Sequence, residues 1–99
     1  MTTIWAPLAV ERLEEEVRFI AQDKPEAARR WAEQLLEHLD RVAEFPRSGR
    51  MVPELGREDI REIVHGSHRI IFRIVDDGVR ILTIRHVARL LDEEDLKGS

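Results

Sequence analysis

Residues 60–91 read IREIVHGSHRIIFRIVDDGVRILTIRHVARLL, and this stretch decides the fold. Its isoleucines, valines and phenylalanine are residue types that favour β-strands. Turn signals divide it, so we predict three strands, Ile60–His65, His68–Val75 and Val79–His86. Asp77-Gly78 is a strong two-residue hairpin signal because both residues tolerate the positive φ angles of a type I′ turn, and Gly66-Ser67 is a weaker one.

The two turns fix a register by counting, and the alternation of side chains then assigns the two faces. Arg69 is predicted to lie opposite His86, and Ile71 opposite Ile84. One face carries the residues expected to pack against helices, namely Ile63, Ile70, Phe72, Ile74, Ile81 and Thr83. The other face is expected to be exposed, with Glu62, Arg69, Arg73, Arg80 and His86 around a floor of Val64, Ile71, Leu82 and Ile84.

The same segment contains arginine but no lysine; its arginines are Arg61, Arg69, Arg73, Arg80, Arg85 and Arg89. Because the planar guanidinium binds carboxylate or phosphate through two parallel hydrogen bonds, we interpret the exposed face as an anion-binding surface. The target-binding candidates are Arg69, Arg73, Arg80 and Arg89. The alternative is that arginine stems cover apolar surface while their heads stay solvated. Arg61 and Arg85 count onto the core face, where we expect them to pair with helix carboxylates.

The N-terminal half predicts a short strand, Thr2–Ala6, and two helices. Pro7 suits the first turn of the first helix, and Asp23 with Glu26 forms a capping-box pattern before the second. Apolar residues at helical spacing follow each start: Val10, Leu13, Val17 and Ile20, then Ala28, Ala32, Leu35, Leu39 and Val42. Phe45-Pro46 ends the second helix. We therefore expect an antiparallel helix hairpin followed by a loop over residues 46–56.

Composition indicates one small domain, residues 1–99, with a mobile tail over residues 92–99. The chain contains no cysteine, which excludes a disulfide framework, a thiol nucleophile and a thiolate metal site. The sequence shows no signal peptide and no membrane span, and we expect a cytoplasmic protein that uses no cofactor and no metal. The formal net charge of −4 hides a basic block, residues 46–91, which carries nine basic and six acidic residues.

Several short motifs follow one another over nearly the whole chain: Ile4-Trp5, Asp23-Lys24-Pro25, Pro46, Gly49-Arg50, Val52-Pro53-Glu54-Leu55, His68-Arg69-Ile70-Ile71-Phe72-Arg73-Ile74 and Arg85-His86-Val87-Ala88-Arg89-Leu90-Leu91. In their order and spacing the chain resembles the RelE/ParE superfamily of toxins from type II toxin-antitoxin (plasmid stabilisation) systems. The resemblance implies an α+β fold in the order β-α-α-β-β-β. In that fold a short N-terminal strand and an antiparallel helix hairpin pack on one face of a small twisted antiparallel sheet.

The superfamily contains two functional classes, and the resemblance implies different site residues for each. RelE-like members cut messenger RNA, usually in the ribosome, through attack of the ribose 2′-hydroxyl. This reaction requires a base, an acid and cations on the phosphate. For that class the resemblance implies phosphate binding by Arg69 and Arg89 and a general-base role for Glu54. His86 is a candidate proton donor, and the alternative is a neutral ring beside Arg69.

The chain departs from the nuclease pattern at several positions. The paired lysines of other members fall at Ile60 and Glu62, and the terminal His-Tyr pair of the glutamate-using branch falls at Val87 and Ala88. The chain contains no tyrosine, and its pI of about 5.6 does not suit an RNA-binding protein.

These departures favour the second class, ParE-like toxins, which poison DNA gyrase by binding it. Inactive family membership is a further alternative. A DNA-binding module is disfavoured because both predicted helices are acid-rich. A toxin of either class implies a cognate antitoxin, expected to dock along the sheet edge or the apolar floor beside Arg69.

Overall fold

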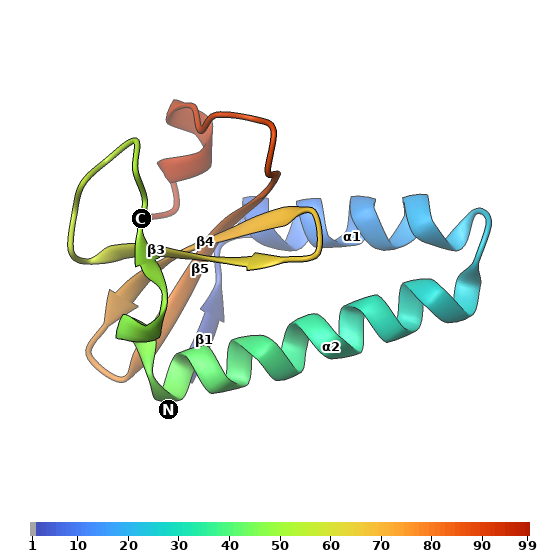
Figure 1. The fold of residues 1–99 in the computed structure, drawn as a ribbon, viewed down its shortest axis with the longest axis horizontal. Coiled ribbons are helices and arrows are strands. Elements are labelled where there is room, and N and C mark those ends of the chain that lie inside the picture. Colours follow the sequence, from blue (N-terminus) through green and yellow to red (C-terminus); the bar gives the residue numbers. More distant parts are fainter. Residues whose placement is uncertain (1) are drawn as a thin grey trace.

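Residues 2–99 are described by a computed structural model, and they form two α-helices and a five-stranded sheet (Figure 1). The helices are α1, Pro7–Ala21, and α2, Pro25–Glu44. The strands are β1, Thr2–Trp5; β2, Arg50–Met51; β3, Ile60–His65; β4, His68–Val75; and β5, Gly78–His86. Short 3-10 helices span Pro46–Ser48 and Glu93–Leu96. The α+β class and the helix hairpin predicted from sequence are confirmed.

The strand order is β1-β5-β4-β3-β2. β3, β4 and β5 pair antiparallel, as predicted, whereas β1 pairs with β5 in parallel and makes the sheet mixed. β2 pairs antiparallel with β3, with Arg50 opposite Glu62. The prediction of a plain loop over residues 46–56 is therefore wrong. A two-residue strand is too short to leave a periodic signal in the sequence.

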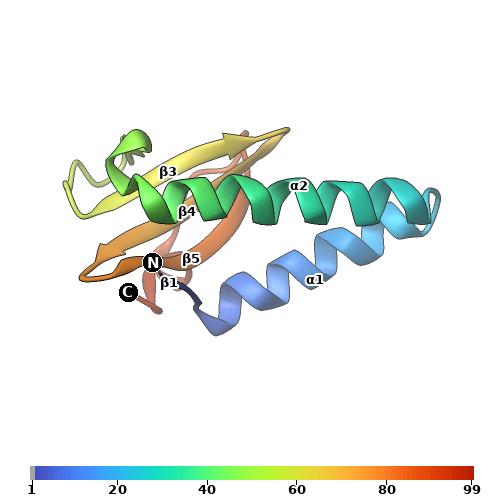
Figure 2. The same cartoon turned by 90° about the horizontal axis from the view of Figure 1, so that it is seen from below.

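The helix hairpin covers one face of the sheet, and its tip projects past the strands (Figure 2). The core between the two layers is built on fully buried residues that include Leu35, Leu39, Ile70, Phe72 and Ile81. Ile63 and Ile74 pack at its margin, as the alternation of side chains predicted. The core face of β3 and β4 is therefore confirmed.

The opposite face of the sheet, which was predicted to be exposed, is covered by a second core. In this core Val52, Ile60, Ile71 and Leu82 are 0% exposed, and Leu55, Leu91 and Leu96 pack against them. Burying such an apolar floor removes it from water and stabilises the fold. The cover comes from the loop before β3 and from residues 87–99, which we call the C-terminal segment. Residues 92–99, predicted as a mobile tail, include a 3-10 helix whose Asp95 is 0% exposed.

The turn between β4 and β5 is built differently from the prediction. Val75 lies opposite Gly78, so the turn residues are Asp76 and Asp77. A type I′ turn at Asp77-Gly78 would need a positive φ at Asp77. Among residues 2–99 only glycines have a positive φ. Gly78 instead begins β5 with a φ of 140° and lies against β1.

A β-bulge also shifts the register of β5. The turn at Asp76-Asp77 moves the predicted pairing by two residues, and the skipped Leu82 between Ile71 and Phe72 moves it back by one. Arg69 therefore lies opposite Arg85 rather than His86. Ile71 likewise lies opposite Thr83, not Ile84. The extra residue reverses the facing of the later part of β5. Ile84 joins the helix-side core, and Thr83 donates to Asp95 of the C-terminal segment.

The two helix starts illustrate how prolines set helix boundaries. Pro7 occupies the first position of α1, as predicted. The capping box at Asp23 and Glu26 does not form, because Pro25 begins α2 and makes Lys24 the N-cap, without a side-chain cap bond. The amide of Asp23 still donates to the Ile20 carbonyl at the end of α1. Over residues 2–99, neither helix has the length and apolar character needed to span a membrane.

Candidate functional site

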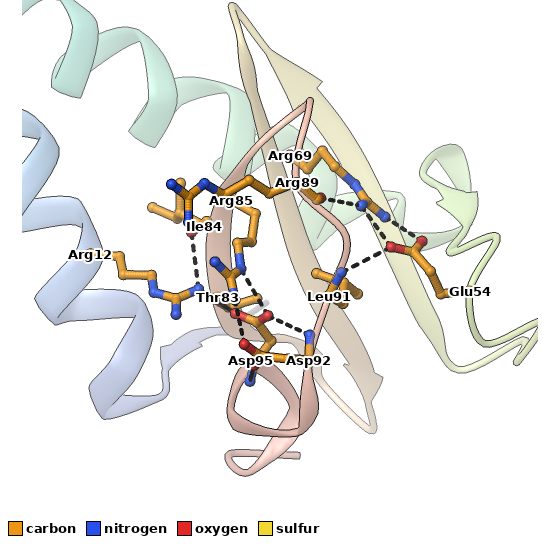
Figure 3. A network of polar contacts seen from close by, with 10 residues as sticks. All are labelled: Arg12, Glu54, Arg69, Thr83, Ile84, Arg85, Arg89, Leu91, Asp92 and Asp95. Atoms are coloured by element: carbon orange, nitrogen blue, oxygen red, sulfur yellow. Dashed lines mark hydrogen bonds and ion pairs between the residues drawn. The ribbon is translucent and has the colours of Figure 1, made fainter.

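Arg69 is the centre of a polar cluster on the covered face of the sheet (Figure 3). Its side chain is 7% exposed. The guanidinium donates from Nη1 and Nη2 to the two Glu54 oxygens at 2.8 and 2.7 Å. It donates from Nε and Nη2 to Glu62 Oε1 at 3.0 and 2.6 Å, and from Nη1 to the Arg89 carbonyl at 3.2 Å. Since a guanidinium has five N–H groups, Arg69 has none left for another ligand.

Glu62 extends the cluster to the edge of the sheet. Its side chain on β3 is 0% exposed, and its second oxygen accepts from Arg50 Nε at 2.7 Å and Nη2 at 2.6 Å. Arg50 stands directly across from Glu62 because β2 pairs with β3 at this point. Glu54, Arg69, Glu62 and Arg50 thus alternate in charge and form a neutral chain of ion pairs, which we call the Arg69 cluster. Pairing of this kind offsets the cost of burying charge.

The Arg69 cluster also sets the acid-base properties of its members. The hydrogen bonds from Arg69, together with the Leu91 amide, lower the pKa of Glu54 to about 2, although partial burial acts in the opposite direction. The same carboxylates raise the pKa of Arg69 above its ordinary value. Glu54 is therefore a weakly basic carboxylate at neutral pH, and Arg69 is permanently charged.

His86 and Arg89 belong to a different place in the structure. With Arg12, Glu16, His68 and Arg85 they line a cavity of about 410 Å³ between α1 and the end of β5. The Arg89 side chain runs away from Arg69, toward Ile84 and Arg12 (Figure 3). The ring of His86 stands edge-on to His68, with 5.7 Å between centroids, and its Nδ1 accepts from the Ala88 amide. The four candidate catalytic residues therefore separate into two pairs, Arg69 with Glu54 and Arg89 with His86.

Arg73 and Arg80, the other target-binding candidates, lie directly opposite each other on β4 and β5. Like charges in this arrangement repel. The Arg80 Nε donates to the Gly98 carbonyl, whereas the Arg73 Nε is buried and meets no hydrogen-bond partner among residues 2–99. Both side chains are half-buried rather than displayed on an open face.

The sequence predicts that Arg61 and Arg85 pair with helix carboxylates, and this prediction is wrong for both. Arg61 donates to the carbonyls of Glu58 and Gly49. Arg85 pairs with Asp92 at 2.7 Å and Asp95 at 2.9 Å in the C-terminal segment. The bulge in β5 turns Arg85 toward residues 92–95, and the backbone on either side of β2 binds Arg61. Neither feature is visible in the sequence pattern.

A second polar cluster, centred on Asp95, was missed entirely. Asp95 accepts from Arg12 of α1, from Thr83 at 2.8 Å and from Arg85, and it completes a capping box with Asp92 (Figure 3). Burial alone would raise the pKa of Asp95, but these hydrogen bonds hold it below its ordinary value. The spacing of Asp92 and Asp95 was the available signal. This cluster fastens the C-terminal segment to the sheet and α1. Residues 2–99 contain no group of three or more metal-ligating side chains.

The chain matches a known protein family, a relative of known sequence and a solved structure. Residues 3–91 match the family model described as ParE toxin of type II toxin-antitoxin system, parDE. The chain is 38% identical over 88 residues to Toxin RelE2 of Caulobacter vibrioides, covering 88% of this chain and 96% of that protein. A solved structure, the chromosomal ParDE toxin-antitoxin system from P. aeruginosa, superposes with a TM-score of 0.71 over 87% of this chain and 95% of that one. At 18% identity the latter match shows the fold alone.

Proposed function

Because the chain belongs to the ParE toxin family of type II toxin-antitoxin systems, we propose that it inhibits DNA gyrase by binding it in the cytoplasm. Membership of this family confirms the resemblance to RelE/ParE toxins read from the sequence. It also implies a cognate antitoxin that neutralises the chain. The choice between gyrase and messenger RNA as the target depends on the site.

The observation that carries the proposal is the bidentate ion pair between Glu54 and Arg69. A nuclease of the RelE type needs a base with a pKa near the working pH and a cation free to meet the phosphate. Glu54, with a pKa of about 2, is a poor base. Arg69 directs all five N–H groups at partners within the chain. The pair thus engages the two groups that such a nuclease would need free, which supports the gyrase proposal.

The positions of the missing nuclease residues support the same choice. Ile60 and Glu62, which stand where other members carry lysines, are 0% and 1% exposed. They fill the second core and the Arg69 cluster, so neither position presents a cation to a substrate. Val87 and Ala88 are exposed and carry no group that could transfer a proton.

A RelE-like nuclease is the second candidate function, and one observation favours it. His86 and Arg89 line the same cavity, which brings a group able to transfer protons next to a cation that makes no ion pair among residues 2–99. In such an enzyme these two residues, and not Arg69 and Glu54, would form the reactive pair. An inactive family member remains the third alternative.

The decisive experiment induces the chain in growing cells and measures plasmid supercoiling and transcript integrity in the same cultures. We expect loss of supercoiling with DNA damage, intact transcripts and inhibited growth that returns when the neighbouring antitoxin gene is expressed. Purified chain should also inhibit purified gyrase. Arg89→Ala should weaken inhibition because Arg89 is a target-binding candidate, whereas Arg30→Ala, which removes an exposed arginine of α2, should not.

Each alternative gives a different result in this experiment. Rapid transcript cleavage that His86→Ala abolishes would reject the gyrase proposal and establish the nuclease. Growth without either effect at every expression level would identify an inactive family member. Gyrase inhibition that Arg30→Ala reduces as much as Arg89→Ala would remove Arg89 from the target-binding surface.

A further inference from the structure

Glu54 sits on Arg69 in the way that a bound ligand would. Its Oε2 accepts from Arg69 Nη1 at 2.8 Å and from the Leu91 amide at 3.1 Å, and its Oε1 accepts from Arg69 Nη2 at 2.7 Å. These three N–H donors come from β4 and the C-terminal segment, whereas Glu54 comes from the loop before β3. Two planar pairs of donor and acceptor are the usual geometry for arginine recognising a carboxylate. The donors therefore form a carboxylate site, and Glu54 is its occupant.

Exposure shows which of the two carboxylates bound to Arg69 is better placed to leave. The Glu62 side chain is 0% exposed and Arg69 is 7% exposed, whereas Glu54 is 23% exposed. Glu54 lies in the turn Val52–Gly56, which is closed by bonds from the amides of Leu55 and Gly56 to the Val52 carbonyl at 3.0 Å. Val52 and Leu55 anchor this turn in the second core. Rotation of the Glu54 side chain alone can therefore vacate the site while the turn stays in place.

Charge gives the vacated site a preference for anions. Glu62 is shared between Arg69 and Arg50, so its single negative charge cannot neutralise both arginines. Glu54 supplies the second negative charge. When Glu54 swings away, one net positive charge and three N–H donors remain at a partly buried position. Unpaired charge and unsatisfied donors in such a place are costly, so a replacement anion would be stabilised there.

We propose that Arg69 and the Leu91 amide form an oxyanion-binding site that Glu54 occupies in the free chain, and that a carboxylate of a protein partner replaces Glu54 on binding. The assignment to a protein carboxylate rests on the proposed function, in which the partners are proteins. The site itself rests on geometry alone. The occupant seen in the structure is itself a planar carboxylate held by two parallel bonds from Arg69, which favours a carboxylate over a nucleic-acid phosphate.

Replacement of Glu54 has a consequence for the C-terminal segment. The Leu91 amide binds Glu54, and the Arg89 carbonyl binds Arg69, so this segment is held by both members of the pair. A partner carboxylate that takes over the same donors keeps the segment in place. A partner that removed Glu54 without replacing it would leave the Leu91 amide and Arg69 unpaired. Replacement of Glu54 by another carboxylate is therefore favoured over a state in which the site is empty.

The test is chemical rescue of the purified Glu54→Ala variant by acetate. Thermal unfolding is followed in sodium acetate and in sodium chloride at equal ionic strength, with sodium phosphate as a third arm. We expect Glu54→Ala to melt below the wild type, and acetate to raise its Tm in a saturable way by about 5 °C relative to chloride. Wild type should show no difference between the salts. Glu58→Ala, which removes an exposed glutamate of the same loop, is the matched control and should behave like wild type.

Different results of this assay overturn different parts of the proposal. A folded Glu54→Ala with equal Tm in acetate and chloride overturns the site, and so does an acetate effect of the same size in wild type. Rescue by phosphate but not by acetate overturns the carboxylate assignment. If Glu54→Ala does not fold, Glu54→Gln takes its place, because the amide keeps the size of the side chain while removing the charge. Acetate should then still raise the Tm. Growth inhibition is not measured in this assay, so failure of the gyrase proposal leaves its result unchanged.

Discussion

At the scale of one residue, the sequence predicts the face of the sheet on which Arg69 lies but not its burial. Alternation along β4 places Arg69 and Arg73 on the face away from the helices, and this facing holds in the structure, where Arg69 contacts Glu54 and Glu62. Its burial could not be predicted. The segments that cover it come from residues about 15 before and 20 after it in the sequence. A pattern of neighbouring residues carries no information about segments so far away in the sequence.

Arg69→Ala should lower the free energy of unfolding by about 3 to 5 kcal/mol, because removal of one partner leaves buried charge uncompensated. Glu62 is 0% exposed and would keep only Arg50, while Glu54 would lose both of its arginine bonds. Urea unfolding followed by circular dichroism measures this change.

Arg57→Ala is the matched control for Arg69→Ala. Arg57 makes a comparable two-bond pair with Asp59, at 3.0 and 2.7 Å, but its side chain is 54% exposed. Solvent screens such a pair, so Arg57→Ala should lower the free energy of unfolding much less than Arg69→Ala does. Equal losses in the two variants would mean that burial does not strengthen the Arg69 cluster.

At the scale of elements, strand positions were predictable, but their exact pairing was not. β-branched runs and turn signals gave β3, β4 and β5 almost to the residue. The bulge at Leu82 was not predictable, because it depends on how β5 satisfies both the helix-side core and Asp95. Gly78 was read as a turn residue. Its conformation is used instead to let β1 approach β5.

Gly78→Ala should therefore disrupt the β1–β5 pairing. The φ of 140° is one that residues other than glycine rarely adopt, and an added Cβ would lie 1.9 Å from the Thr2 carbonyl oxygen. The expected loss of stability exceeds the cost of backbone strain alone, about 1 to 3 kcal/mol. Hydrogen exchange should show reduced protection of the Thr2–Trp5 amides, while the β3–β4 amides remain protected.

Gly66→Ala provides the comparison for strain without a clash. Gly66 also has a positive φ, 61°, but nothing lies within 4 Å of an added Cβ. This variant should lose only the strain contribution and should keep β1 protected. If Gly66→Ala destabilises the chain as much as Gly78→Ala, close approach of β1 is not the reason for glycine at position 78.

At the scale of the whole molecule, a row of rings joins the helix layer to the far end of the sheet. Trp31 on α2 stands edge-on to His65 and to His68, with centroids 5.9 and 5.7 Å apart. The Nδ1 atoms of His38 and His65 are 3.5 Å apart, and His68 pairs with Glu16 of α1 at 3.3 Å. Sequence reasoning did not find this row, because its members come from α1, α2, β3 and β4.

The row makes stability depend on pH near neutrality. Burial lowers the pKa of His38, and the nearby charges of His65 and Arg41 lower it further. Burial also lowers the pKa of His65, although a hydrogen bond with the Trp31 backbone acts in the opposite direction. The folded chain therefore binds protons at these sites less readily than the unfolded chain. Their contribution to stability is fully present above the unfolded value of 6.5 and is lost as the pH falls below it.

We accordingly expect the Tm to fall between pH 7.5 and pH 5.5, and to fall less in His38→Gln, which removes one proton-binding site and the repulsion with His65. Glu54 does not contribute in this window, because its stabilising effect is lost only below its unfolded value of 4.5, toward a pH of about 2. Measurement of both proteins at pH 8, where His38 and His65 are neutral, isolates the packing cost of the substitution. A pH dependence that is unchanged in His38→Gln would show that the contact between α2 and β3 is insensitive to protonation, and the acid lability of the fold would then have to come from its carboxylate clusters.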